Sequence, residues 1–233
     1  MMRLAKVVAL LPSAGQGTRM GAGVKKPYLE VHGRPLLTYT LDVFEQHPLI
    51  DGMVIVTEAE YVSYTQREIV EKYGYTKVLA VTAGGRERQD SVLCGLKILP
   101  EETQWVAVHD GARPLVSAGI ISRVLEEAWA KGSAVAGVRV KDTIKKVGGD
   151  LSITETPERR LLWQIQTPQV FRRELLVQAY ERAAAEGWTG TDDASFVERL
   201  GEKVYLAEGA YTNIKITTPE DLIYLQALLE VKD

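Results

Sequence analysis

The fold is decided by the stretch VVALLPSAGQGTRM, residues 7–20. Its first five residues are apolar and rich in valine, which is typical of a strand buried on both faces of a parallel sheet. Small residues follow at once, and they allow backbone N–H groups to approach a phosphate closely. Because open α/β sheets bind ligands at the carboxyl ends of their strands, this stretch predicts both a sheet strand and a ligand site.

The same apolar pattern returns along the first half of the chain. Further valine-rich runs occupy residues 53–56, 78–81 and 106–108. Helical patterns occupy residues 36–47, 61–73, 91–99 and 120–131, and in the last of these the apolar residues recur at spacings of three and four. This alternation, joined by right-handed crossovers, predicts an α/β fold with a doubly wound, mostly parallel sheet. The length of 233 residues fits one domain over residues 1–233.

The rhythm changes after Ser133. Residues 134–147 are long for a strand, Gly148-Gly149-Asp150 is a strong turn signal, and a second β-like run covers residues 151–155. We therefore expect a protruding β-hairpin arm at about residues 139–162. Its outer part is too polar for a core, so it is either a solvated excursion or an element that packs on a partner chain.

The remaining sequence predicts five shorter elements. They are a helix over 173–186, a short helix after 191–193, strands over 203–206 and 213–216, and a C-terminal helix with Pro219 at its first position.

Composition narrows the class of protein. The net charge of −3 gives no global basic field, so we expect no nucleic-acid partner. Cys94 is the only cysteine, which excludes an intramolecular disulfide. The apolar run before Pro12 is too short for a signal-peptide core or a membrane span, so we expect a cytoplasmic protein without a membrane partner.

The loop after the first strand does not match two familiar phosphate loops. A dinucleotide fingerprint would need glycine where Met20 stands, and no Gly-Lys followed by Ser or Thr occurs. The loop instead carries charge: four cations (Arg19, Lys25, Lys26, Arg34) stand against one anion (Glu30). Such a loop suits a triphosphate whose leaving group must be neutralised, although a solvated basic loop remains an alternative.

Three further candidate site positions lie at or just after the ends of predicted strands. Gly84-Gly85 follows the third strand. Asp110 ends the fourth strand, where a carboxylate either holds Mg²⁺ against a triphosphate or caps the next turn. Lys215 stands between apolar neighbours, which is unfavourable unless an anion or solvent meets it.

Taken together, the motifs resemble the 2-C-methyl-D-erythritol 4-phosphate cytidylyltransferase family, within the nucleotidyltransferase superfamily. The resemblance covers nearly the whole chain. It rests on the loop 12–26, Gly84-Gly85-x-Glu87-Arg88-x-x-Ser91-Val92, Asp110-x-Ala112-Arg113-Pro114, Asp142-Thr143, Thr167-Pro168-Gln169, Thr191-Asp192-Asp193-Ala194-Ser195 and Asn213-Ile214-Lys215. Two departures are Lys25, where the family usually has proline, and Pro27, where it often has glutamine.

The resemblance implies a Rossmann-like nucleotidyltransferase fold and a role for each matching residue. The implied catalytic cations are Arg19, Lys26 and Lys215. The implied nucleotide-binding residues are Pro12, Ser13, Ala14, Gly15, Gly17, Gly84, Gly85 and Ser91. The implied substrate-binding residues are Asp110, Arg113, Thr143, Arg159, Thr167 and Thr191, with Asp110 also a ligand for the cofactor Mg²⁺. Thr143 and Arg159 lie on the arm, which in this family reaches into the neighbouring subunit's site, so a homodimer is implied.

The implied reaction joins CTP to methylerythritol phosphate and releases pyrophosphate, in non-mevalonate isoprenoid biosynthesis. The nucleophile is a phosphate monoester, whose second pKa is about 6, so it needs no general base at pH 7. This agrees with the lack of a Ser-His-Asp or Cys-His arrangement in the sequence. Three alternatives remain: a cytidylyltransferase for ribitol 5-phosphate, a nucleotidyltransferase for another sugar, and a non-catalytic nucleotide-binding or regulatory module.

Overall fold

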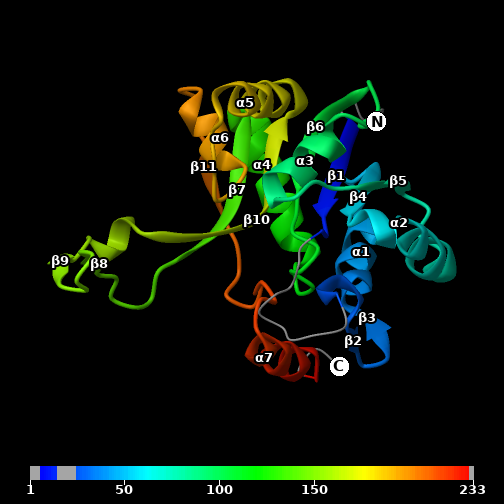
Figure 1. Cartoon of the computed structure of the whole chain (residues 1–233), viewed down its shortest axis with the longest axis horizontal. Coiled ribbons are helices and arrows are strands. Elements are labelled where there is room, and N and C mark those ends of the chain that lie inside the picture. The colour runs from blue at the N-terminus through cyan, green and yellow to red at the C-terminus, as the bar shows by residue number, and fades with distance from the viewer. Residues whose placement is uncertain (1–5, 15–24, 231–233) are drawn as a thin grey trace.

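The computed structural model describes residues 6–14 and 25–230, and its centre is a seven-stranded sheet. The strand order is β11-β7-β10-β6-β1-β4-β5. The strands are β1 (Lys6–Pro12), β4 (Gly52–Thr57), β5 (Val78–Ala83), β6 (Thr103–Val108), β7 (Ser133–Arg139), β10 (Trp163–Arg172) and β11 (Tyr205–Glu208). All neighbouring pairs are parallel except those of β10, which runs antiparallel to both β6 and β7. The predicted doubly wound, mostly parallel sheet is confirmed (Figure 1).

Helices cover both faces of the sheet, and β1 shows how one strand serves both. Val7, Ala9 and Leu11 belong to one core cluster, together with side chains of α1 and α4, whereas Val8 and Leu10 belong to a second, with α3, α5 and α6. Successive side chains of a strand point to opposite faces, so a strand covered on both faces is apolar throughout. The helices are α1 (Leu36–Gln46), α3 (Arg88–Leu96), α4 (Ala118–Lys131), α5 (Arg173–Glu186), α6 (Ala194–Arg199) and α7 (Pro219–Glu230). Among the described residues, no helix combines the length and apolarity needed to cross a membrane.

The predicted helix over 61–73 is present, but its geometry is mixed. A 3₁₀ turn, η2 (Ala59–Tyr61), leads into a short α-helical piece, α2 (Val62–Tyr64), and then into a π-helical segment, η3 (Thr65–Glu71). Shorter elements lie between β1 and α1: the 3₁₀ turn η1 (Lys26–Tyr28) and the paired strands β2 (Glu30–Val31) and β3 (Arg34–Pro35).

One strand prediction is wrong. Residues 213–216 form no strand; instead Ile216 donates its N–H to the carbonyl of Ala112, and Asn213 donates to that of Ala210. The long run over 134–147 contains two strands, because β7 ends at Arg139 and the short strand β8 (Lys146–Val147) follows on the arm.

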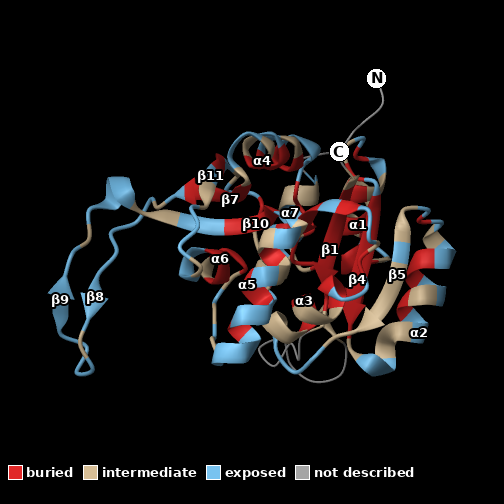
Figure 2. Ribbon diagram, turned by 90° about the horizontal axis from the view of Figure 1, so that it is seen from above, coloured by how far each residue is buried: buried red, intermediate tan, exposed pale blue. Residues whose placement is uncertain are grey.

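The arm is a two-stranded hairpin of β8 (Lys146–Val147) and β9 (Ile153–Glu155) that projects from one side of the molecule (Figure 1). The predicted turn is present, with the Gly148 N–H donating to the carbonyl of Ser152 over 2.9 Å. The buried residues concentrate in the central strands, whereas the hairpin is exposed (Figure 2). At the root of the arm the Lys141 ammonium lies 3.4 Å from the ring centroid of Tyr211, whose hydroxyl donates to the Arg139 carbonyl over 2.8 Å.

Candidate active site

The carboxyl ends of β1, β4 and β6 meet at Pro12 and Ser13. The Ser13 N–H donates to the carbonyl of Val56 over 2.7 Å, and the Gly111 N–H donates to that of Pro12 over 3.2 Å. A Cβ atom on Gly111 would lie 2.2 Å from the Ser13 hydroxyl oxygen, so the two chain segments are in direct contact. The first loop and the Asp110 strand end therefore share one edge of the sheet, as the parallel topology requires.

The glycine pair after β5 packs directly on residues implied to bind the nucleotide. Gly84 donates its N–H to the carbonyl of Thr57 over 2.7 Å. A Cβ atom on Gly84 would lie 2.4 Å from the Ser91 hydroxyl oxygen and 3.1 Å from the Ala14 Cβ. The structure thus brings Ala14, Gly84 and Ser91 together, and only glycine fits at position 84. Gly15, Gly17 and Arg19 lie outside the described residues.

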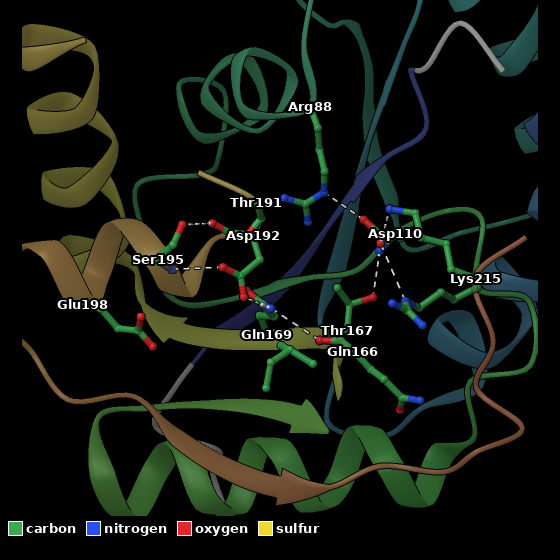
Figure 3. A pocket seen from close by; sticks show the side chains of 12 residues that line it. Arg88, Asp110, Gln166, Thr167, Gln169, Thr191, Asp192, Ser195, Glu198 and Lys215 are labelled. Carbon is green, nitrogen blue, oxygen red and sulfur yellow. Dashed lines mark hydrogen bonds and ion pairs between the residues drawn. The ribbon is translucent and has the colours of Figure 1, made fainter. Parts of the chain in front are cut away.

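A cavity of about 400 Å³ lies beside this edge (Figure 3). It contains five of the residues implied to bind substrate or to catalyse: Asp110, Arg113, Thr167, Thr191 and Lys215. Seven further residues line it: Arg88, Ile165, Gln166, Gln169, Asp192, Ser195 and Glu198. These twelve come from the loop after β6, from α3, from β10, from α6 with the loop before it, and from the segment before α7.

Asp110 is held among three cations (Figure 3). Its Oδ1 accepts from Arg88 Nε over 2.9 Å, and its Oδ2 lies 2.9 Å from Lys215 Nζ and 3.6 Å from Arg113 Nε. Burial alone would raise the pKa of Asp110, but the charges of Arg88, Lys215 and Arg113 outweigh it and hold that pKa well below its usual range. Asp110 is therefore a carboxylate at neutral pH, and its ion pair holds the Lys215 ammonium at the cavity.

Arg88 also pairs with a second buried carboxylate. Its two terminal nitrogens donate to Asp193 over 3.0 and 2.8 Å, the bidentate geometry that suits a guanidinium. Asp193 accepts a further bond from the Tyr180 hydroxyl over 2.5 Å. Burial lowers the pKa of Arg88, but Asp193 and Asp110 together raise it well above its ordinary value. The pair joins α3 to the start of α6 and so shapes one wall of the cavity.

Thr167 has its hydroxyl occupied within the protein. It accepts from the Asp110 N–H over 3.0 Å and lies 3.0 Å from Nδ1 of His109. The other ring nitrogen of His109 faces the Arg113 carbonyl at 3.3 Å, which can only accept, so Nε2 carries the proton and Nδ1 accepts from Thr167. Burial lowers the pKa of His109 to about 3, so the ring is neutral. Thr167 and His109 thus orient the backbone of Asp110.

The donor set around Asp110 does not fit a resident Mg²⁺. Both carboxylate oxygens already face cationic side chains, and a divalent ion would have to displace them against like charge. Among residues 6–14 and 25–230, no three His, Cys, Asp or Glu side chains are grouped so as to hold a metal ion.

Three of the described residues implied to catalyse or to bind substrate do not line this cavity. Thr143 and Arg159 are exposed on the arm, where Arg159 donates to the Lys141 carbonyl over 2.8 Å. Lys26 begins the 3₁₀ turn η1, which lies in the chain between β1 and the strands β2 and β3.

The structure also adds residues to which the sequence assigned no role. Arg88, Gln169 and Asp193 all occur in the motifs quoted above, and their presence there is the feature of the sequence that could have identified them as site residues. Gln169 donates to Asp192 over 2.9 Å and accepts from the N–H groups of Asp193 and Ala194, which fastens the start of α6. Because Arg88 and Asp193 are 105 residues apart, no local pattern pairs them.

Comparison with known proteins gives the same answer over the whole chain. The sequence profile of 2-C-methyl-D-erythritol 4-phosphate cytidylyltransferase matches residues 7–231. A protein of that name from Geotalea uraniireducens is 47% identical over 227 residues, covering 97% of each chain. Another, from Syntrophotalea carbinolica, is 49% identical over 226 residues and 96% of each chain.

Solved structures agree with the sequence relatives. The crystal structure of 4-diphosphocytidyl-2C-methyl-D-erythritol synthase from Anaerococcus prevotii superposes with a TM-score of 0.88 at 32% identity, covering 97% of this chain and 96% of that one. The 2-C-methyl-D-erythritol 4-phosphate cytidylyltransferase from Thermus thermophilus gives a TM-score of 0.76 at 34% identity, covering 95% and 98%.

The fold, the charged cavity beside the strand ends and the relatives together define a nucleotidyltransferase enzyme. The chain belongs to the 2-C-methyl-D-erythritol 4-phosphate cytidylyltransferase family.

Proposed function

We propose that this chain, acting as one cytidylyltransferase domain, transfers the cytidylyl group of CTP to 2-C-methyl-D-erythritol 4-phosphate. The products are 4-diphosphocytidyl-2-C-methyl-D-erythritol and pyrophosphate, and the reaction belongs to non-mevalonate isoprenoid biosynthesis. The observation that carries the proposal is the mixed charge of the cavity, where three cations (Arg88, Arg113, Lys215) and three carboxylates (Asp110, Asp192, Glu198) line one space. A polyol phosphate needs both, because its hydroxyls donate to carboxylates and its phosphate accepts from cations.

The chemistry requires placement and charge rather than a base. An oxygen of the substrate phosphate, already ionised at pH 7, attacks the α-phosphorus of CTP, and the bond from that phosphorus to the oxygen of the β-phosphate breaks. We infer that Lys215, whose Nζ lies 2.9 Å from Asp110 Oδ2, contacts the attacking phosphate and the α-phosphate. Arg19 and Lys26 supply positive charge to the phosphates of CTP as pyrophosphate departs.

Mg²⁺ enters this scheme as part of the CTP substrate, bound to the triphosphate. Asp110 then serves the polyol hydroxyls and Lys215 instead of the metal. The Asp110 carboxylate, which would have to bind the metal ion, already forms ion pairs with Arg88, Lys215 and Arg113.

Pyrophosphate release tests the proposal directly. The purified chain is incubated with CTP, Mg²⁺ and either methylerythritol phosphate or ribitol 5-phosphate, and the nucleotide product is identified by mass spectrometry. We expect turnover with methylerythritol phosphate and a kcat/KM at least a hundredfold lower with ribitol 5-phosphate. A reversed preference would assign the chain to the ribitol reaction, and no turnover with either would reject the cytidylyltransferase assignment.

The arm at about residues 139–162 acts, we infer, as a dimerisation element that delivers Thr143 and Arg159 to a second copy of the chain. Large apolar side chains on it are exposed, with Leu151 80% exposed, Leu161 70% and Ile153 62%. A hairpin that exposes so much apolar surface without a core of its own fits burial against a partner. Arg159 and Thr143 both belong to this arm, and neither lines the cavity of its own chain.

Mixing two inactive variants tests the shared site. Lys26→Ala and Arg159→Ala homodimers should each have little activity, since each lacks one cation in both sites. After subunit exchange half of the dimers are mixed, and one of their two sites regains both residues, so activity rises to at most about a quarter of wild type. If native mass spectrometry shows exchange and the mixture stays inactive, the two residues do not share a site across the dimer.

A further inference from the structure

Tyr28, two residues after Lys26, occupies an unusually well-defined position for a side chain at the end of a loop. Its side chain is buried, with 6% exposed, although η1 is a turn of three residues only. The ring stacks on Tyr61 with centroids 4.8 Å apart and planes at 10°, and meets Tyr64 edge-on at 5.2 Å. The two partners belong to η2 and α2, so the ring packs the end of the nucleotide loop against the helical segment after β4.

The hydroxyl of Tyr28 adds a second, directional constraint. It lies 2.6 Å from the Thr57 hydroxyl and 2.6 Å from the Thr65 hydroxyl, and because it has one proton it donates to at most one of them. Thr57 is the last residue of β4 and Thr65 the first of the π-helical segment η3, and both are buried. One side chain therefore ties η1 to a strand end and to a helix.

Thr57 connects the same anchor to the glycine pair. Its carbonyl accepts from the Gly84 N–H over 2.7 Å, while its hydroxyl faces Tyr28. A neighbouring ion pair, Lys25 Nζ to Glu58 Oε2 at 2.7 Å, joins the residue before Lys26 to the residue after Thr57. The end of β4 therefore contacts both the residues around Lys26 and the turn at Gly84.

The turn itself transmits the constraint. Tyr28 donates its N–H to the Lys25 carbonyl over 2.9 Å, and Leu29 donates to the Lys26 carbonyl over 3.2 Å. Pro27 fixes φ between the two residues. The Lys26 backbone cannot shift without moving Tyr28, and Tyr28 cannot move without breaking two buried hydrogen bonds.

We propose that Tyr28 is a positioning residue for Lys26: its hydroxyl, held between Thr57 and Thr65, sets where the Lys26 ammonium meets the phosphates of CTP. The proposal rests on the proposed role of Lys26 as a cation for the transferred phosphate. Loss of the hydroxyl would remove a buried partner from both threonines, so a purely structural role predicts lower stability without a specific loss of kcat. A positioning role predicts a loss of kcat as well, because a displacement of about 1 Å can lower a rate about a hundredfold.

A double-mutant cycle separates positioning from general stability. Tyr28→Phe, Lys26→Ala and the double variant are made in the full chain, and kcat and KM for CTP are measured for each alongside the thermal midpoint. Tyr75→Phe is the matched control, because Tyr75 is a buried tyrosine, 7% exposed, whose hydroxyl bonds Thr38 and Asp42 in the same half of the protein. Thr65→Val removes one partner of the Tyr28 hydroxyl and is measured in the same way, so the test stands if Tyr28→Phe fails to fold.

We expect Tyr28→Phe to lower kcat on the order of tenfold, with KM for CTP within about twofold of wild type. In the Lys26→Ala background the same change should alter kcat by less than about twofold, because the group being positioned is gone. Tyr75→Phe should leave kcat within about twofold. Equal losses in both backgrounds, or an unchanged kcat for Tyr28→Phe, would overturn the positioning role alone. An unchanged kcat for Lys26→Ala would instead refute the proposed role of Lys26 and this inference with it.

Discussion

Replacing Asp193 with asparagine removes the charge from a carboxylate that is fully buried. In the wild-type protein it accepts two bonds from Arg88, at 3.0 and 2.8 Å, and one from the Tyr180 hydroxyl at 2.5 Å. Asparagine has nearly the same shape, but it places an amide with two donors where the guanidinium and the phenol also donate. The variant therefore keeps the packing and loses the pair.

The size of the effect follows from the burial of the pair. Breaking a buried ion pair by removing one partner costs about 3–5 kcal/mol. Arg88 retains its bond to Asp110 at 2.9 Å, so the lower end applies and we expect about 3 kcal/mol. In a protein of this length 1 kcal/mol lowers the thermal midpoint by about 2–4 °C, so the midpoint should fall by about 6–12 °C.

Urea denaturation followed by fluorescence measures the free energy of unfolding. The matched control is Glu186→Gln, which breaks the exposed pair between Arg182 and Glu186 on α5 and should cost less than about 1 kcal/mol. If Asp193→Asn also costs less than about 1 kcal/mol at an unchanged m value, Arg88 and Asp193 do not form the buried pair described above.

Three other predictions concern the strand ends. Lowering the pH from about 6.5 to about 3 should reduce the free energy of unfolding. In this range the unfolded chain binds a proton at His109, whereas in the folded protein burial lowers the pKa of His109 to about 3 and the ring stays neutral. Urea denaturation of wild type and His109→Gln should show a flatter profile for the variant; Asp110, whose pKa is also lowered, adds its own loss only below about pH 4. Asp110→Asn should raise the KM for the polyol phosphate roughly tenfold. The Mg²⁺ concentration for half-maximal activity should stay within about twofold, and titrating activity against each of the two measures both effects. A large shift in the Mg²⁺ dependence would instead identify Asp110 as a metal ligand. Gly84→Ala should raise the KM for CTP roughly tenfold, because the new Cβ would lie 2.4 Å from the Ser91 hydroxyl. In the control Gly119→Ala the nearest contact of the new Cβ would be 3.4 Å, so its KM for CTP should not change. Equal KM values in the two variants would contradict a nucleotide pocket at Gly84.

The N-terminal half of the sheet could be predicted because its strands are apolar on both faces. The side chains of Val7 to Leu11 pack alternately into the two core clusters, so every one of them must be apolar and the sequence shows a continuous apolar run. The β10 strand could not be predicted in the same way. Pro168 stands in its middle, and proline cannot donate to a ladder, which argues against a central strand. The structure accommodates it by a register shift between Ile165 and Gln169.

The candidate site was predictable where residues follow a strand and less so where they pair at a distance. Asp110 and Gly84 follow strands, and parallel topology brings such positions to one edge. Lys215 was assigned to a strand because it alternates with Ile214 and Ile216, whereas it lies in an irregular segment and is placed by its ion pair with Asp110. The partners of Asp110 could not be known, so its environment as a carboxylate among cations could not be distinguished from a metal site.

The position of β10 between β6 and β7 has a consequence for synthesis on the ribosome. The strands β1, β4, β5 and β6 have all been synthesised by residue 108, but the neighbour that covers the open side of β6 is complete only at residue 172. At translation rates of about 5–20 residues per second, the nascent chain carries that row of unpaired N–H and carbonyl groups for about 3–13 s. A growing chain in this interval is a half-sheet with an exposed template for strand addition, so crowded polysomes and slow codons between positions 108 and 172 should favour misassembly between neighbouring nascent chains.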